Sequence, residues 1–217
     1  MMIRFRDPVS GLTHLFGFLV SIPGLILLVW NAAHFSTPWH IVSFSIFGAS
    51  LILLYAASSL YHLVPVSDKG VKILRRIDHI MIFVLIAGTY TPVCLIPLRG
   101  AWGWSLLGSI WGLAILGIFL KIFWRNCPRW ISTIIYIFMG WLVLIAFFPL
   151  IKTIPLTGFS WLVIGGFLYT IGAVIYGTKR PRISAKWLGF HEIFHLFVLA
   201  GSFSHFWLML KYLMYLN

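Results

Sequence analysis

The sequence predicts an all-α membrane protein, in which residues 1–217 form a single bundle of seven transmembrane helices. Of its 217 residues, 61% are hydrophobic and only 9% are charged, whereas about 45–50% of an average soluble domain is apolar. Apolar runs also recur along the whole chain, each close to the roughly 20 residues that a helix needs to cross a bilayer. These runs leave no room for a separate soluble domain.

The apolar segments follow one another from near the N-terminus to near the C-terminus, separated by short polar stretches. The predicted spans are residues 12–33, 41–64, 77–97, 102–122, 131–150, 159–177 and 188–213.

The first span follows the basic residues Arg4 and Arg6, as the apolar part of a secretory signal peptide would. It lacks a convincing cleavage site of small residues, however, and further spans follow at once. We therefore interpret it as a transmembrane helix.

The later spans differ in where they carry polar side chains. The second ends near His62 and the third begins near Asp78, so polar groups lie at their adjoining ends. The fourth, fifth and sixth spans are almost wholly apolar, which counts against an aqueous pore through the bundle. The seventh opens at His191 and stays polar at intervals as far as His205.

The distribution of the sixteen basic residues predicts the orientation. Three of them, Arg99, Lys152 and Lys211, fall on one side of the predicted membrane. The other thirteen fall on the opposite side: Arg4, Arg6, Lys69, Lys72, Arg75, Arg76, Lys121, Arg125, Arg129, Lys179, Arg180, Arg182 and Lys186. The positive-inside rule then places the N-terminus in the cytoplasm and the C-terminus outside. Because the charges lie in short loops rather than on one face, a nucleic-acid partner is not expected.

Polar groups within predicted spans mark a candidate site, because charged and polar side chains are costly in hydrocarbon. The predicted topology brings His14, His62, His79, His191 and His195 to one shallow layer on the cytoplasmic side. His205 follows His195 by ten residues, which places it roughly 15 Å deeper on a helix.

The spacing of His191 and His195 favours a metal site. Residues four apart share a helix face, so both imidazoles can bind one Zn²⁺, and His62 is the natural third ligand at matching depth. The run also spells the H-E-x-x-H of zinc proteases. That interpretation is disfavoured, since two ligands do not make a catalytic site and Glu192 is rotated away by about 100°. Three imidazoles would leave the fourth position to water.

Two further residues are candidates for chemistry at this site. Ser58 precedes His62 by one helical turn and can hydrogen-bond its imidazole or a bound water. Asp78 can accept a proton from that water, or it can be a buried partner of Arg75 or Arg76. His14 is expected to have a supporting or structural role. For His79 and His205 the sequence leaves site and packing roles open.

Several short motifs resemble the hemolysin III family, the bacterial branch of the progestin and adipoQ receptor superfamily, which includes the adiponectin receptors. They are Asp7-Pro8, Thr13-His14, Ser58-Ser59-Leu60-Tyr61-His62, Asp78-His79, Gly88-Thr89-Tyr90-Thr91-Pro92 and the stretch from His191 to His205. The resemblance implies seven helices, a cytoplasmic N-terminus and a zinc ion held at His62, His191 and His195, with an aspartate at the place of Asp78. Two positions depart from the pattern: receptor members commonly carry glutamine in place of Glu192, and the first acidic residue is usually glutamate in place of Asp7.

The function expected from this resemblance is zinc-dependent hydrolysis of lipid amide or ester bonds, similar to a ceramidase, in the inner (plasma) membrane of the cell. The expected partners are membrane lipids, one of them the substrate. The alternatives are a non-enzymatic regulator of membrane lipids with a structural zinc, or a cytolytic protein. Copper, iron and nickel also suit imidazole ligands. Substrate and oligomeric state are left open.

Overall fold

A computed structural model describes residues 6–124, 126–182 and 188–216. Within these ranges the chain is helical and contains seven helical segments long and apolar enough to cross a membrane, which confirms the predicted all-α class and the seven long apolar helices. The helices are α1 (Pro8–Phe35), α2 (Pro38–Leu63), α3 (Asp68–Leu95), α4 (Ala101–Phe123), α5 (Arg129–Trp141), α6 (Phe147–Thr153), α7 (Leu156–Thr178) and α8 (Phe190–Lys211). Short 3-10 helices, η1 (Leu142–Ala146) and η2 (Leu213–Tyr215), follow α5 and α8.

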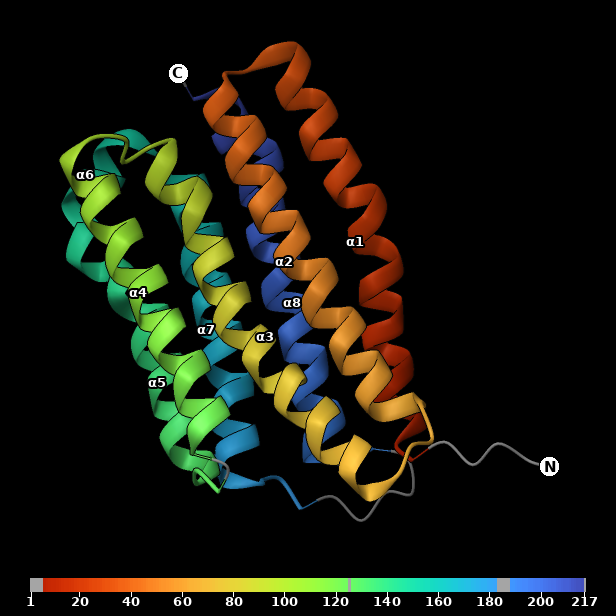
Figure 1. Ribbon diagram of the computed structural model, residues 1–217. Coiled ribbons are helices and arrows are strands. Elements are labelled where there is room, and N and C mark those ends of the chain that lie inside the picture. Colours follow the sequence, from red (N-terminus) through yellow and green to blue (C-terminus); the bar gives the residue numbers. More distant parts are fainter. Residues whose placement is uncertain (1–5, 125, 183–187, 217) are drawn as a thin grey trace.

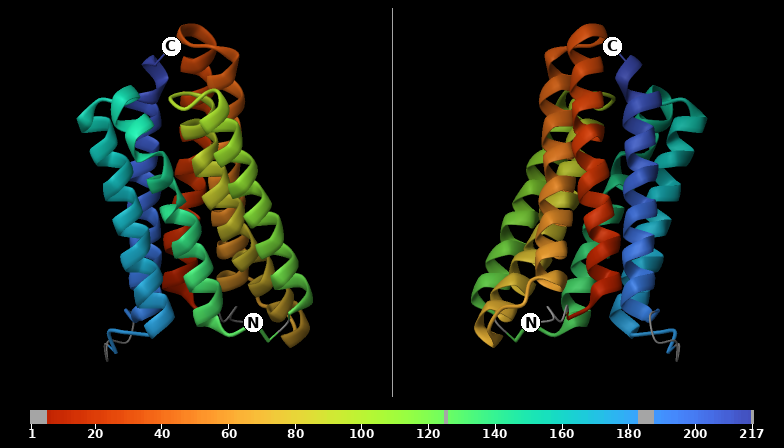
Figure 2. Two further views of the ribbon diagram at one scale, coloured as in Figure 1. Left: turned by 90° about the vertical axis from the view of Figure 1, so that its left-hand side faces the viewer. Right: turned by 90° about the vertical axis from the view of Figure 1, so that its right-hand side faces the viewer.

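Consecutive long helices run up and down the bundle, so that α1 begins at one end and α8 finishes at the other (Figure 1). The last helix, α8, packs against both α7 and α1, and α2 packs against α1 and α3 (Figure 2). The start of α8 and the end of α2 consequently lie at the same end of the bundle, next to the start of α1. This arrangement positions the candidate site.

Apolar side chains both fill the bundle and cover its outside. Phe44, Phe47 and Phe83 are fully buried between helices, whereas Phe16 and Phe148 are more than half exposed. Exposed apolar area of this extent is unusual for a water-soluble protein. It is what a lipid-facing surface requires, because hydrocarbon solvates apolar side chains and helices satisfy their own backbone groups.

The fifth crossing is a broken helix made of α5, η1 and α6. At the break, the Tyr90 hydroxyl lies 2.7 and 2.8 Å from the carbonyl oxygens of Met139 and Gly140 and accepts a 2.8 Å hydrogen bond from the Val143 N–H. One side chain of α3 thus satisfies backbone groups that the interrupted α-helical ladder leaves open.

The third helix begins at Asp68, well before the predicted span at 77–97. Ser67 caps it by accepting a hydrogen bond from the Gly70 N–H. The basic stretch 68–76 is therefore helical, and our expectation of a loop there was wrong. These first turns carry Lys69, Lys72, Arg75 and Arg76 at the end of the bundle where α1 begins.

Basic residues gather at that same end. Within the described ranges, ten lie there and only Arg99, Lys152 and Lys211 lie at the opposite end. Arg4, Arg125 and Lys186, which belong to the same prediction, lie outside the described residues.

Candidate metal centre

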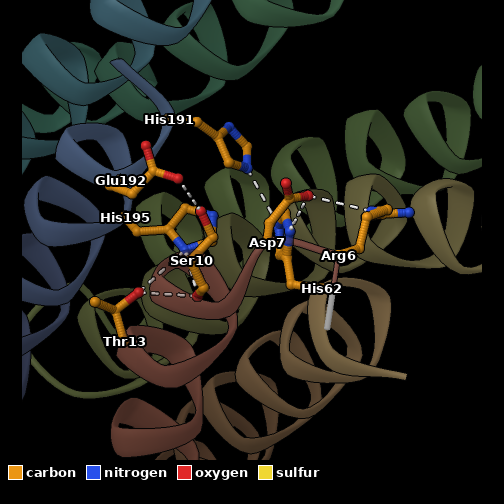
Figure 3. Close-up of polar contacts among 8 residues, drawn as sticks. All are labelled: Arg6, Asp7, Ser10, Thr13, His62, His191, Glu192 and His195. Atoms are coloured by element: carbon orange, nitrogen blue, oxygen red, sulfur yellow. Dashed lines mark hydrogen bonds and ion pairs between the residues drawn. The ribbon is translucent and has the colours of Figure 1, made fainter. Parts of the chain in front are cut away.

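Three histidines from two helices meet at the end of the bundle where α1 begins. His62 lies in the last turn of α2, and His191 and His195 lie one turn apart at the start of α8. One ring nitrogen of each lies within 4.8 Å of those of the other two. His62 and His195 are buried and His191 is half-buried. The three residues predicted as metal ligands thus form one cluster (Figure 3).

One pair of ring nitrogens in this cluster has the spacing of two ligands of a metal ion. The Nε2 atoms of His62 and His191 face one another at 3.2 Å. Two nitrogen ligands of a tetrahedral zinc, each about 2.0–2.1 Å from the ion, lie about 3.3 Å apart. A donor set of three imidazoles without sulfur suits zinc and also other transition metals. The cluster can therefore hold a metal, and its donors alone do not specify which.

Partners on α1 and just before it orient two of the rings. The His62 Nδ1–H donates to the carboxylate of Asp7 at 3.2 Å, and the His195 Nδ1–H donates to the Ser10 carbonyl at 3.0 Å (Figure 3). The Thr13 hydroxyl lies 3.4 Å from the same His195 nitrogen. Such outer contacts fix the tautomer and leave Nε2 free to bind a metal.

This role of Asp7 is not predicted by the sequence patterns. Asp7 stands at the N-cap position of α1, directly before Pro8, but its side chain makes no capping hydrogen bond. Its carboxylate instead contacts His62 and, at 3.2 Å, the Arg6 guanidinium. The one feature of the sequence that could have indicated this role is the position of an acidic residue directly before the first span.

Among the described residues, Glu192 makes no hydrogen bond to the three histidines. Its carboxylate accepts hydrogen bonds from the Ser10 hydroxyl at 2.7 Å and from the Gly189 N–H at 2.8 Å. It thereby satisfies a backbone donor at the start of α8, where negative charge is favoured, and ties α8 to α1. This engagement agrees with rejecting the protease interpretation of the H-E-x-x-H spelling.

His14 lies behind the cluster rather than in it. Its ring stacks on that of His195, with centroids 3.6 Å apart, and meets the edge of Tyr55 at 5.0 Å. Neither ring nitrogen has a hydrogen-bond partner among the described residues. His14 therefore packs against a candidate ligand, as the supporting role predicted.

A narrow cavity of about 130 Å³ leads from the histidines into the bundle. Asp78 and Ser58, both buried, line it together with His191 and His195. Within the described ranges no basic side chain forms an ion pair with Asp78, so the alternative that it pairs with Arg75 or Arg76 was wrong.

Two further histidines that the sequence left open, His79 and His205, lie outside the cluster. The Nε2 atom of His79 lies 3.0 Å from the Tyr176 hydroxyl and joins α3 to α7. His205 lies at the deep end of the cavity, with its Nε2 3.2 Å from the Leu162 carbonyl. Between these depths the cavity wall is mainly apolar, formed by side chains such as Ile82, Ile86 and Val198.

Seven long apolar helices around a buried three-histidine cluster define a multi-pass membrane protein with a candidate metal centre. The family described as Haemolysin-III related matches residues 3–206 of the chain. The chain belongs to the hemolysin III family, as the motifs predicted.

Individual relatives agree with this assignment. The chain is 45% identical over 213 residues to the Hemolysin-3 homolog of Bacillus subtilis (strain 168), covering 97% of this chain and 96% of the relative. It is 42% identical over 205 residues to Hemolysin-3 of Bacillus cereus, covering 94% and 90%. It is 24% identical over 179 residues to the human Monocyte to macrophage differentiation factor, covering 81% and 72%.

Proposed function

We propose that this protein is a zinc-dependent hydrolase of lipid amide or ester bonds. The observation that carries the proposal is the convergence of His62, His191 and His195 beside a cavity that also contains Asp78. Zinc held by these three histidines would supply a Lewis acid and would lower the pKa of a water molecule to about 7. The rest of the chemistry falls to the side chains of the cavity.

Asp78 is the proton carrier in this proposal. Its carboxylate is buried and lacks an ion-pair partner in the described part of the chain, so it is available to take a proton from the attacking water and return it to the leaving group. Ser58 lines the same cavity one turn from His62 and orients the water or the scissile carbonyl. The apolar wall leading to His205 suits an acyl chain.

The proposed location is the inner (plasma) membrane of the cell, with the N-terminus in the cytoplasm. The support is the excess of basic residues at the end of the bundle where α1 begins, which the positive-inside rule assigns to the cytoplasm. The candidate centre then faces the cytoplasmic leaflet.

A test uses the full chain in lipid nanodiscs, with short-chain ceramides and lipid esters as substrates. Wild type should release the fatty acid, Asp78→Asn should lose most of the rate while keeping its metal, and His191→Ala should lose both. Turnover unchanged in both variants would reject the proposal.

A second candidate is a non-enzymatic regulator of membrane lipids with a structural metal. It is favoured by the contacts that link α1, α2 and α8 at the cluster through Asp7, Ser10 and the three histidines. Metal removal should then lower the melting temperature of a protein that consumes no lipid. A cytolytic function is suggested only by the names of the relatives. Vesicles that leak no faster with the protein than without it would reject that function.

A further inference from the structure

A wide vestibule of about 1040 Å³ opens beside the candidate metal centre. It shares Asp78, His79 and His191 with the narrow cavity, so the two spaces adjoin. The basic side chains that line it are Lys69, Lys72, Arg75, Arg76, Lys121, Arg129 and Lys179. Only three acidic residues line it, so the vestibule carries an excess of positive charge.

Lys121 is the informative member of this group. It lies in the last turn of α4 and is only 9% exposed, although a lysine near the membrane interface usually extends its ammonium into water. Its ammonium donates to the Ser132 hydroxyl on α5. The positive-inside rule explains basic residues at this end of the bundle but does not explain why one is buried there.

No carboxylate neutralises this buried charge. All four acidic side chains of the chain are in the described ranges, and none forms an ion pair with Lys121. The Asp7 carboxylate contacts His62 and Arg6, and that of Glu192 contacts Ser10 and Gly189. A buried unpaired cation is costly, and a bound anion would compensate it.

We propose that Lys121, with Arg75 and Arg129 in the lining of the same vestibule, forms a subsite for a phosphate-type anion, the headgroup of an amphiphile whose tail enters the apolar cavity. The part of the ligand that joins its headgroup to its tail would then lie beside the three histidines. The inference rests on the proposed function only in assigning the anion to a substrate. Binding of an anion at the subsite does not require turnover.

The test measures binding by the full-length chain in uncharged detergent, as a ligand-dependent rise in melting temperature. The probes are dihexanoyl phosphatidic acid, dihexanoyl phosphatidylcholine and inorganic phosphate. Phosphatidic acid should bind wild type saturably and at least about tenfold more tightly than phosphatidylcholine. Inorganic phosphate that binds as tightly as phosphatidic acid would support the anion subsite and assign it to a soluble ligand.

Variants separate the subsite from general charge. Lys121→Met should weaken phosphatidic acid binding about tenfold or more, while Lys152→Met, an exposed lysine at the opposite end, should leave it unchanged. Arg75→Gln changes an exposed side chain of the vestibule, does not threaten folding, and should weaken binding severalfold. Equal binding of phosphatidic acid by wild type and by both vestibule variants would overturn the inference.

Failure of the hydrolase proposal would look different. His191→Ala should still bind phosphatidic acid, because the histidine cluster does not supply the positive charge. A protein that binds phosphatidic acid through Lys121 but cleaves no lipid would keep the subsite and reject only the hydrolase.

Discussion

Replacing Asp7 by alanine should weaken metal binding although Asp7 is not itself a candidate ligand. Its carboxylate accepts the Nδ1–H of His62 at 3.2 Å, which holds the ring with Nε2 toward His191. Without it the imidazole loses both its orientation and the negative charge that makes it a stronger donor to the metal.

The magnitude follows from the setting of this contact. Removing such outer partners costs about 10–100-fold in metal affinity. The side chain of Asp7 is 46% exposed, so water screens its charge and the lower end applies. We expect Asp7→Ala to raise the Kd for zinc about tenfold, or roughly 1.4 kcal/mol. Asp7→Asn keeps an acceptor oxygen, so its Kd for zinc should lie between those of wild type and Asp7→Ala.

The assay is competition for zinc between the purified chain and a chromophoric chelator. Asp68→Asn is the matched control, because Asp68 is exposed at the start of α3 and should not alter the affinity. A Kd for Asp7→Ala within about twofold of wild type would refute the reasoning that the carboxylate orients His62.

Three further predictions concern stability and are read from thermal unfolding. Glu192→Ala should cost about 1 kcal/mol, because the cap of α8 and the link to Ser10 are lost, whereas Glu192→Gln keeps an acceptor oxygen and should cost less; equal losses would contradict this. Tyr90→Phe should cost about 1–3 kcal/mol, since it leaves buried backbone groups of the broken helix unpaired, and the exposed Tyr215→Phe should cost little; equal effects would count against the role of the hydroxyl. Zinc at about 100 times its Kd should raise the free energy of unfolding of the wild type by roughly 2.7 kcal/mol and leave that of His195→Ala unchanged. Equal stabilisation of both would place the ion elsewhere.

The sequence predicts much of the histidine cluster. Apolar runs of helical length give the number of spans, and an up-and-down path brings the end of the second to the start of the seventh. The interval between His191 and His195 then places both on one face. Periodicity and depth thus predict the pair and the layer in which its partner lies, and of the histidines in that layer the structure groups His62 with the pair.

The contacts around the cluster could not be derived in that way. Asp7 reaches His62 because the backbone before α1 folds over the end of α2, where the Asp7 N–H donates to the His62 carbonyl at 3.3 Å. This is a packing contact between residues 55 positions apart, and no periodicity encodes it. The pairing of Glu192 with Ser10 is of the same kind.

Two features of the helices were also beyond the pattern. The first turns of α3 extend outside the apolar layer, so their charged residues resemble a loop when spans are recognised by hydropathy alone. The break after Trp141 depends on Tyr90 of another helix. Vestibule and cavity depend on both features, because residues 68–76 and the broken helix supply parts of their walls.

The most direct test of the metal centre is elemental analysis of the purified wild type beside His62→Ala, His191→Ala and His195→Ala. The arrangement of the three ring nitrogens predicts about one zinc per wild-type chain and its loss in each folded variant. A folded wild-type protein without bound metal, or zinc retained in all three variants, would contradict it.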